Sequence, residues 1–335
     1  MGRLKRIQSK DEFADVPAGL ALSIGNFDGV HLGHREILAA ARDVVKSRGL
    51  PGLAVMSFEP HPLAILHPER FSGLLTPLPL KACLLEQNDV DYLIVLKDSY
   101  GLLNLSPADF VEQFLMKNVS PFILIEGNNF NFGYGRSGDV ETLEKLGAEF
   151  GFEVLVVPPL KIKLAGDRPA TVSSSLIRNL LAFGNVEDSA RALGRFYRLI
   201  GEVIPGRGKG VQLGFPTANI QPADQIIPAE GVYAGLVEIA GSQDAVCRSN
   251  EKIPAVFSIG RAKTFVADQH LLTEAHILTG DVGSLKGKWL AMDFVAKIRN
   301  QQRFENEHRL SEQIAIDCKT AKNILATEFT ENTEK

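Results

Sequence analysis

The chain has 335 residues, of which 45% are hydrophobic and 23% charged, so its composition is that of an ordinary globular protein, not a disordered or fibrous one. Lys and Arg number 36 against 40 for Asp and Glu, and the resulting net charge of −4 lacks the basic excess that drives nucleic-acid binding. We therefore expect small-molecule substrates and no nucleic-acid partner. This length predicts two domains or a single large one.

The three cysteines predict neither a disulfide framework nor a zinc cage, because their number is odd and no two form a CxxC pair. No apolar run approaches the roughly 20 residues of a membrane helix. The N-terminal sequence MGRLKRIQSKDEF also lacks the apolar core of a signal peptide. We expect a cytoplasmic protein with no membrane partner, and the oligomeric state stays open.

Residues 18–184 alternate short apolar runs with helical patterns. The runs GLALSIG, LAVMSF, YLIVL, FILIEG and EVLVVP are typical of buried parallel strands, and an amphipathic helix between the first two ends at Gly49. Such alternation predicts right-handed βαβ units in a doubly wound α/β sheet, with ligands at the carboxyl ends of the strands.

The second half of the chain has a different pattern. The segments YRLIGEVI, GVYAGLVEI, IPAVFSIG, LLTEAHIL and WLAMDFVAKI are strand-like and separated by turns, which predicts an antiparallel β-barrel. One final amphipathic helix is expected to pack on this barrel through a face formed by Leu310, Ile314, Cys318, Ala321 and Leu325. We place the domain boundary between residues 186 and 187.

Residues 25–34, GNFDGVHLGH, directly follow the first predicted strand and precede a helix. Glycines allow the backbone to approach a phosphate, and a helix N-terminus offers free N–H groups. Two histidines three residues apart lie on one turn and can donate hydrogen bonds to phosphoryl oxygens. The expected catalytic residues are His31 and His34, and the expected phosphate-binding residues are Gly25, Asn26, Phe27, Asp28 and Gly33.

Two other interpretations of the histidine pair stay open. The residues could be ordinary surface histidines at a helix start, since short patterns often occur by chance. They could also hold zinc, but no third ligand is evident nearby.

The segment GNFDGVHLGH resembles the HxGH signature of nucleotidyltransferases, in the form found in the adenylyltransferase module of bacterial bifunctional riboflavin kinase/FAD synthetases. Three further segments of that family pattern follow in order: 58–62 (FEPHP), 127–133 (GNNFNFG) and 173–178 (SSSLIR). The family usually has Thr where Ser175 stands, and the hydroxyl is retained. The resemblance implies a Rossmann-like FMN adenylyltransferase domain over residues 1–186.

These segments add candidate ligand-binding residues. Asn129 can both donate to and accept from a flavin or adenine, and Phe130 and Phe132 can pack on a ring, although aromatic residues beside glycines often only pack the loop. Three hydroxyls at a predicted helix N-cap, with Arg178 one turn later, could bind ATP phosphates; they belong to Ser173, Ser174 and Ser175. Serine caps are also common without any ligand.

A second motif, residues 205–219 (PGRGKGVQLGFPTAN), follows the first strand of the predicted barrel. Its glycines predict a backbone cover over nucleotide phosphates, although the spacing is not that of a P-loop and such stretches are often mobile turns. Thr217 and Asn219 share one side of an extended chain and can offer oxygens to a magnesium ion bridging phosphates. The expected phosphate-binding glycines are Gly206, Gly208, Gly210 and Gly214.

The GFPTAN segment resembles the riboflavin kinase module of the same family, which implies a kinase domain over residues 187–335. Glu274 then fits the family's general base, accepting the proton of the ribityl hydroxyl as it attacks the γ-phosphorus. From spacing alone, Glu274 and His276 could instead line a solvated barrel face. The chain departs from the family pattern at Val211, Ser258 and Lys263.

The resemblance implies an enzyme that converts riboflavin to FMN and FMN to FAD. ATP and Mg²⁺ serve both steps, and flavins are substrate and product. Two alternatives stay open: another HxGH nucleotidyltransferase, or a flavin-binding regulatory protein with a degenerate kinase domain.

Overall fold

The computed structural model describes residues 4–9, 11–97, 101–206, 210, 213–247, 251–261, 271–279 and 282–333. The chain forms two compact units: Met1–Ile162 with Pro169–Ser173, and Lys163–Arg168 with Ser174–Lys335. The expected boundary at residues 186 and 187 falls later in the chain than this division and stays a prediction about the two catalytic domains.

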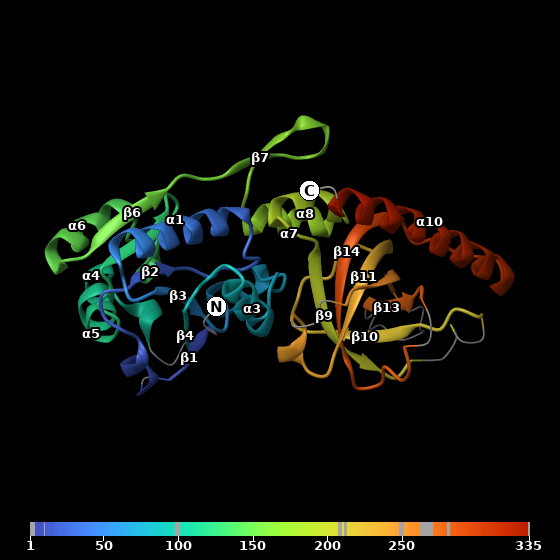
Figure 1. Ribbon diagram of the computed structural model, residues 1–335, viewed down its shortest axis with the longest axis horizontal. Helices are drawn as coiled ribbons and strands as arrows, with labels where there is room; N and C mark the ends of the chain where they lie inside the picture. The colour runs from blue at the N-terminus through green and yellow to red at the C-terminus, as the bar shows by residue number, and fades with distance from the viewer. Residues whose placement is uncertain are drawn as a thin grey trace. The chain divides into compact units, whose positions relative to one another are not determined.

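The first unit contains a six-stranded parallel sheet in the order β1-β4-β3-β2-β5-β6 (Figure 1). Its strands are β1 (Lys5–Ile7), β2 (Ala21–Ile24), β3 (Leu53–Phe58), β4 (Tyr92–Leu96), β5 (Ile123–Gly127) and β6 (Glu153–Val157). The helices are α1 (Leu32–Arg48), α2 (Pro62–Leu66), α3 (Leu78–Glu86), α4 (Pro107–Asp109), α5 (Met116–Asn118) and α6 (Val140–Phe150). The predicted doubly wound sheet is confirmed, with β1 as an additional edge strand.

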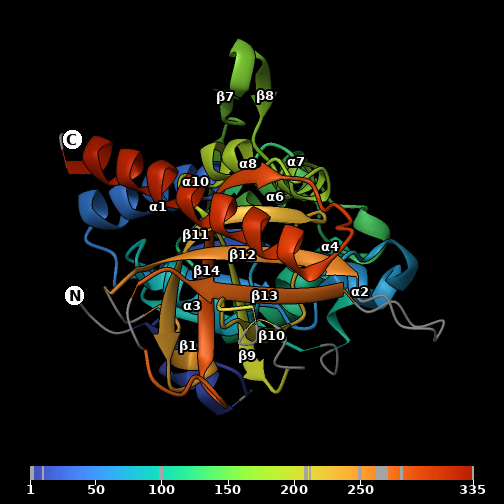
Figure 2. The same cartoon turned by 90° about the vertical axis from the view of Figure 1, so that its right-hand side faces the viewer.

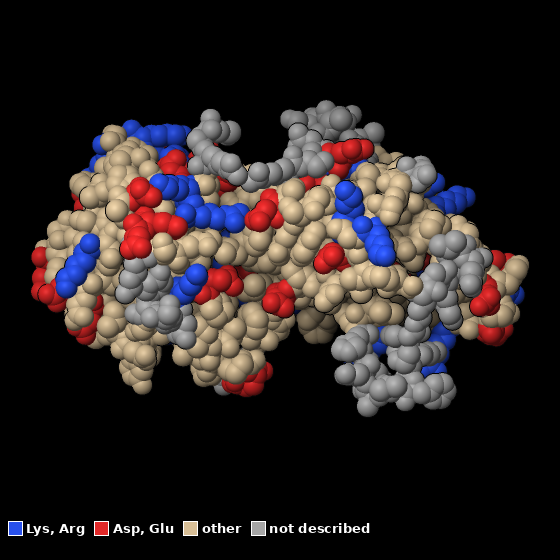
Figure 3. Space-filling model, turned by 90° about the horizontal axis from the view of Figure 1, so that it is seen from below, with Lys and Arg blue, Asp and Glu red and all other residues tan. Residues whose placement is uncertain are grey.

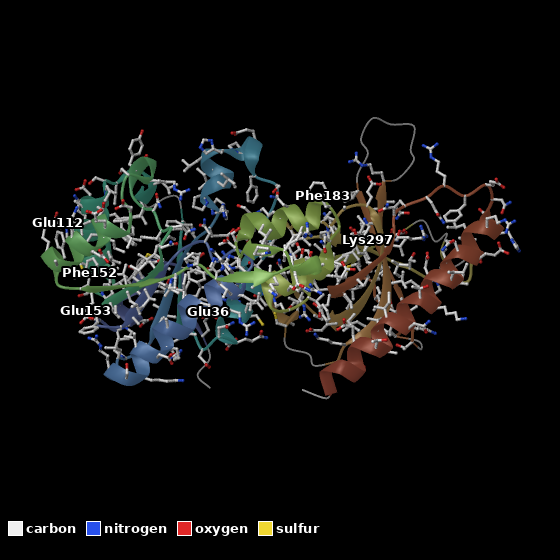
Figure 4. The ribbon with its side chains drawn as sticks, turned by 90° about the horizontal axis from the view of Figure 1, so that it is seen from above. Glu36, Glu112, Phe152, Glu153, Phe183 and Lys297 are labelled. Carbon is white, nitrogen blue, oxygen red and sulfur yellow. The ribbon has the colours of Figure 1, made fainter. Side chains whose placement is uncertain are left out.

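Local sequence accounts for the bounds of these elements. Helix α1 begins after His31, whose side chain caps it, and ends at Gly49, whose left-handed backbone (φ 63°) favours glycine. Buried apolar side chains of α1 lie against β2 and β5. At the start of β6, Phe152 packs into the core whereas Glu153 is exposed; both are labelled in Figure 4. Glu153 accepts a hydrogen bond from Arg48 at 2.8 Å.

The second unit contains a closed antiparallel barrel in the order β10-β13-β12-β11-β14-β9 (Figure 2). Its strands are β9 (Tyr197–Ile204), β10 (Ala218–Pro222), β11 (Gly231–Ala240), β12 (Ile253–Arg261), β13 (Leu271–Ile277) and β14 (Trp289–Arg299), and its helices are α7 (Ser174–Ala182), α8 (Val186–Leu193) and α10 (Glu307–Thr333). A two-stranded sheet pairs β7 (Lys161–Lys163) with β8 (Pro169–Thr171). The predicted barrel is confirmed.

Short helical turns complete the described elements: 3₁₀ turns and one π-helix, Phe110–Leu115, between α4 and α5. The 3₁₀ turns are η1 (Asp11–Asp15), η2 (Pro68–Arg70), η4 (Leu102–Asn104), η6 (Tyr134–Arg136), η7 (Ala165–Asp167) and η8 (Gln243–Ala245).

Helix α10 crosses the outside of the barrel (Figure 2). Of its predicted apolar face, Cys318, Ala321 and Leu325 are buried in a cluster with residues of β11, β12 and β14. A buried ion pair fastens the helix, because Arg299 at the end of β14 donates to both carboxylate oxygens of Asp317, at 2.9 and 2.7 Å. The predicted terminal helix is therefore confirmed, and it is held by charge as well as apolar contact.

None of the helices in the described ranges is both long and apolar enough to cross a membrane. On the face drawn in Figure 3, Lys and Arg side chains are interspersed with Asp and Glu, as the nearly balanced composition leads one to expect.

Candidate functional site

The first candidate site lies where the strand order of the sheet reverses. Strand β2 is flanked on one side by β3 and β4 and on the other by β5 and β6. Ligands of doubly wound sheets bind outside the carboxyl ends of the strands at such a point. The sheet places the segment from Gly25 to His34 directly after β2 and Asn129 shortly after β5, so two of the predicted segments follow neighbouring strands at this crevice.

The loop after β2 has an unusual backbone. Phe27 and Val30 have positive φ angles of 46° and 38°, which non-glycine residues rarely adopt, and Gly29 has φ 97°. Such conformations persist only where the surrounding structure fixes them, and they concentrate at functional sites. The surrounding structure therefore fixes the backbone conformation of this loop.

Asp28 provides much of that fixation. Its buried carboxylate accepts from the backbone N–H groups of Leu75 and Thr76, both at 2.9 Å. The Thr76 hydroxyl in turn accepts from the N–H of Gly29 at 2.9 Å. The motif predicts phosphate binding by Asp28, whereas its carboxylate oxygens are engaged by Leu75 and Thr76, and a carboxylate would repel a phosphate.

The two imidazoles of the motif lie stacked. The ring centroids of His31 and His34 are 3.6 Å apart with 13° between their planes, and the buried Phe27 ring lies 4.9 Å from His34. His31 Nδ1 accepts from the backbone N–H of His34, so in the neutral ring Nε2 carries the proton. A side chain at Gly33 would lie 3.3 Å from the His31 ring, and the motif's glycine therefore lets the pair stack.

A buried lysine lies beneath this loop, and sequence analysis missed it. Lys81 on α3 is 2% exposed and donates to Ser57 Oγ at 3.1 Å, while that hydroxyl donates to the carbonyl of Asn26 at 3.2 Å. Burial lowers the Lys81 pKa, and the charges of Asp28 and Glu59 oppose this shift. Asn26 Oδ1 is buried without a hydrogen-bond partner among the described residues, so it is available to a ligand donor.

Glu126, the next-to-last residue of β5, fills the split between β5 and β2. The backbone pairing of these strands covers only Ala21 with Ile123 and Leu22 with Leu124, and beyond it Glu126 accepts from the N–H of Ile24 at 2.6 Å. Burial raises the pKa of this carboxyl well above 4.5. The Glu126 side chain thus takes the place of a backbone hydrogen bond between β5 and β2 where their pairing has ended.

Glu126→Gln tests this arrangement through the pH dependence of stability. Because the folded-state pKa is raised, folding loses stability as the pH rises from about 4.5 through that pKa. Glutamine keeps an acceptor for Ile24 and stays neutral, so we expect the variant's Tm to exceed the wild type's at pH 8 by about 2–4 °C or more, and the difference to shrink toward pH 5. Differential scanning calorimetry measures this. The exposed Glu149→Gln is the control, and equal Tm values at pH 8 would contradict the argument.

The flavin candidates after β5 differ in exposure. Asn129 is exposed, whereas Phe132 is 8% exposed and belongs to the core, with its ring 6.0 Å from that of Phe110. Phe130 stacks on Phe132 at 5.5 Å and packs against the same core. The structure thus favours loop packing for Phe132, and flavin binding by Asn129 and Phe130 stays a prediction.

The serine-rich segment lies at the start of α7. Ser173 is the last residue of the first unit, and Ser174, Ser175 and Arg178 belong to α7 in the second unit. The predicted helix start is confirmed. The grip of these residues on ATP phosphates stays a prediction.

The second candidate site is a pocket of about 1750 Å³ in the second unit. It brings together Gly206, Gly210, Thr217, Asn219 and Glu274, which are far apart in the sequence. Gly214, with φ 81°, lies in the turn before Phe215 and is not among the lining residues, while Gly208, Val211 and Lys263 lie outside the described residues.

Cross-strand pairing aligns the pocket's polar residues. Asn219 on β10 is directly opposite Glu274 on β13, which is opposite Ser258 on β12. Ser258 is opposite Val232 on β11, and Val232 is opposite Arg299 on β14. All five line the pocket, so one row across the barrel carries the amide, the carboxylate, the hydroxyl and the guanidinium.

Two glycines of the cover, Gly206 and Gly210, make room for the predicted metal ligands. A Cβ at Gly206 would lie 1.8 Å from Asn219 Nδ2, and a Cβ at Gly210 would lie 2.9 Å from Thr217 Oγ1. Neutral hydroxyl and amide oxygens suit Mg²⁺ that keeps phosphate and water ligands. The described residues hold no cluster of three His, Cys, Asp or Glu that could bind a metal alone.

Gly206→Ala is expected to displace the Asn219 side chain, because the added carbon cannot occupy that space. A misplacement of about 1 Å costs roughly 100-fold in rate, so we expect a loss of that size in the phosphoryl transfer predicted for this pocket. Gly241→Ala is the matched control, since no atom lies within 4 Å of its Cβ. Steady-state assays check this, and an unchanged rate in the first variant would contradict the steric argument.

Glu274 has the environment of a base. Burial raises the pKa of its half-buried carboxyl, which brings it toward the range where a carboxylate accepts protons effectively. In the described part of the chain, no hydrogen bond or ion pair engages this carboxyl, so its oxygens remain available to a substrate hydroxyl.

Further pocket residues come from the segment before α10 and from α10 itself, and sequence analysis did not single them out as binding residues. Phe304, Leu310 and Ile314 give this end an apolar lining. Ser258, one of the departures from the family pattern, accepts from Gln301 Nε2 at 3.0 Å. Polar residues such as Arg303, Asn306 and Glu307 from the same segment line the pocket beside these apolar ones. The pocket thus offers both polar and apolar contacts, which suits an amphipathic substrate.

Comparisons with known proteins match the two parts of the chain to two different protein families. The family model for FAD synthetase matches residues 14–174, and that for riboflavin kinase matches residues 193–325. The bifunctional riboflavin kinase/FMN adenylyltransferase of Escherichia coli K12 is 34% identical over 324 residues, 96% of this chain and 98% of that protein. The enzyme of the same name from Pseudomonas fluorescens is 34% identical over 308 residues, 92% of this chain and 94% of that protein.

A solved structure from Streptococcus pneumoniae, named as a macrolide-efflux protein, superposes with a TM-score of 0.81 at 26% identity and covers 96% of this chain and 99% of its own. Both the parallel-sheet unit and the barrel unit therefore have a counterpart in one known chain.

Proposed function

The chain belongs to the family of bifunctional riboflavin kinases/FMN adenylyltransferases, and from this premise we propose which of its residues carry each reaction. The enzyme phosphorylates riboflavin to FMN and adenylylates FMN to FAD. The observation that carries the division is that Glu274, Thr217 and Asn219 line one pocket of the barrel unit, whereas the stacked imidazoles follow β2 of the sheet unit.

Adenylyl transfer is assigned to the crevice at the end of β2. A phosphate oxygen of FMN attacks the α-phosphorus of ATP, and pyrophosphate leaves without a covalent enzyme intermediate. Charge grows on the phosphoryl oxygens in the transition state, and donors already in place there stabilise it. His31 donates through Nε2, since its Nδ1 is occupied by the helix cap, and His34 donates beside it.

Phosphorylation of riboflavin is assigned to the barrel pocket. Glu274 accepts the proton of the ribityl hydroxyl as its oxygen attacks the γ-phosphorus of ATP, and ADP leaves. The residues present fit Mg²⁺, with Thr217 and Asn219 as its protein ligands. When bound, the ion supplies positive charge that neutralises the phosphate oxygens. The apolar lining near α10 would take the flavin ring.

Incubation of the enzyme with riboflavin, ATP and Mg²⁺ tests this function, with flavins separated by chromatography over time. We expect FMN to appear first and FAD to follow from it. Tight flavin binding with no product would favour a regulatory protein, and FAD from supplied FMN with no FMN from riboflavin would leave only a nucleotidyltransferase. Omission of Mg²⁺ is expected to stop both steps. We propose that both reactions take place in the cytoplasm, where ATP is available.

A further inference from the structure

The segment that carries Thr217 lies just outside the barrel ladder, before the first residue of β10. The last pair between β10 and β13 at this end is Ala218 with Ala275. The preceding Pro216 has no N–H to donate, so the backbone pairing cannot continue through it. Some other contact must fix the chain between the glycine-rich cover and β10.

His276 makes that contact. Its Nδ1 lies 2.8 Å from the carbonyl oxygen of Pro216, and because a carbonyl only accepts, Nδ1 carries the proton. Its ring also meets Phe215 edge-on, with centroids 5.6 Å apart. The backbone of His276 is held in turn, since it pairs with Val256 on β12. A side chain from a paired strand thus extends the ladder by one hydrogen bond.

The position of His276 relates it to the reacting groups. It is two residues from Glu274 on the same face of β13, and both line the pocket. Extending the register by one residue beyond the Ala218–Ala275 pair would bring it opposite Thr217, at the end of the two strands that pair Asn219 with Glu274. Phe215, which the ring touches, donates its N–H to the carbonyl of Gly210 in the cover at 2.8 Å.

We propose that His276 is a positioning residue for phosphoryl transfer: its Nδ1–H holds the Pro216 carbonyl and thereby fixes where Thr217 and Asn219 present their oxygens to phosphate-bound Mg²⁺. The inference rests on the proposed function of the barrel pocket. The His276 ring then has two separate roles. Its hydrogen bond fixes the backbone of Pro216, whereas its edge contact with Phe215 contributes only packing.

Two substitutions separate these roles. His276→Phe keeps an aromatic ring against Phe215 but removes the donor, whereas His276→Asn keeps a donor N–H near the place of Nδ1 but removes the ring. We expect His276→Phe to lower kcat/KM for MgATP about 10- to 100-fold, as a misplaced catalytic group does, and to require more Mg²⁺ for half-maximal rate. We expect His276→Asn to stay within about threefold of the wild type.

A binding measurement accompanies the kinetics. Calorimetric titration with ADP and Mg²⁺ should show weaker binding to His276→Phe than to His276→Asn, and quenching of riboflavin fluorescence shows that each barrel is folded. Formation of FAD from FMN should be unchanged in both variants. Equal impairment of the two variants, or wild-type Mg²⁺ dependence in His276→Phe, would overturn the proposal. Failure of the wild type to make FMN would instead overturn the proposed function.

Discussion

Glu274→Gln is expected to lower the rate of FMN formation by about 10²–10⁴-fold, the usual contribution of a general base, and to leave the conversion of FMN to FAD unchanged. Glutamine has almost the same shape but cannot accept the ribityl proton, and the carboxylate has no partner among the described residues whose loss would disturb the barrel. The measurement is the initial rate of each reaction, with riboflavin or FMN supplied separately and the products resolved by chromatography.

The matched control for this variant is Glu202→Gln, an exposed glutamate on β9 that does not line the pocket. It should leave both rates within experimental error of the wild type. A near-normal rate of FMN formation in Glu274→Gln would remove this residue from the mechanism. Loss of both reactions in a folded variant would refute the division into two sites.

His34→Ala is expected to show the reverse pattern: FAD formation should fall by about 10²–10³-fold, the usual cost of removing one donor to a developing oxyanion, while FMN formation should persist. The helix should survive, because the cap of α1 uses the backbone N–H of residue 34, which alanine retains. In the incubation with riboflavin and ATP, FMN should therefore accumulate as the final product.

His308→Ala is the control for this change, since His308 is 81% exposed on α10. It should make FAD at the wild-type rate. If His34→Ala instead made FAD normally, the stacked imidazoles would be a structural pair only.

The sequence predicted the architecture well because hydrophobic periodicity decides it. The buried strands of both units stand out as apolar runs between turns, and all five strands predicted for the barrel are confirmed. Four described strands were missed, namely β1, β7, β8 and β10, and each is only three to five residues long. Strand β10 also begins two residues after Pro216 and ends at Pro222, which hides it from a pattern search.

The sequence indicated which residue types form the candidate sites, but it did not indicate where each side chain points. The motif identified the loop that contains Asp28, yet nothing in GNFDG indicates that the carboxylate turns toward Leu75 and Thr76. Lys81 lies in the segment LPLKACLLE, where a lysine would normally be solvated, and only the packing of α3 against the loop buries it. Such roles depend on contacts between distant residues, which local patterns do not encode.

The row of paired residues across the barrel limits which sequence changes the strands can accept. Neighbouring side chains along a strand point to opposite faces, so a slip of a single residue in β13 would turn Glu274 out of the pocket and expose its apolar neighbour inside. Closure of the barrel forbids that slip, since each strand is locked by partners on both edges. We therefore expect insertions and substitutions to be tolerated in the connecting loops while Glu274 keeps its place in the pocket.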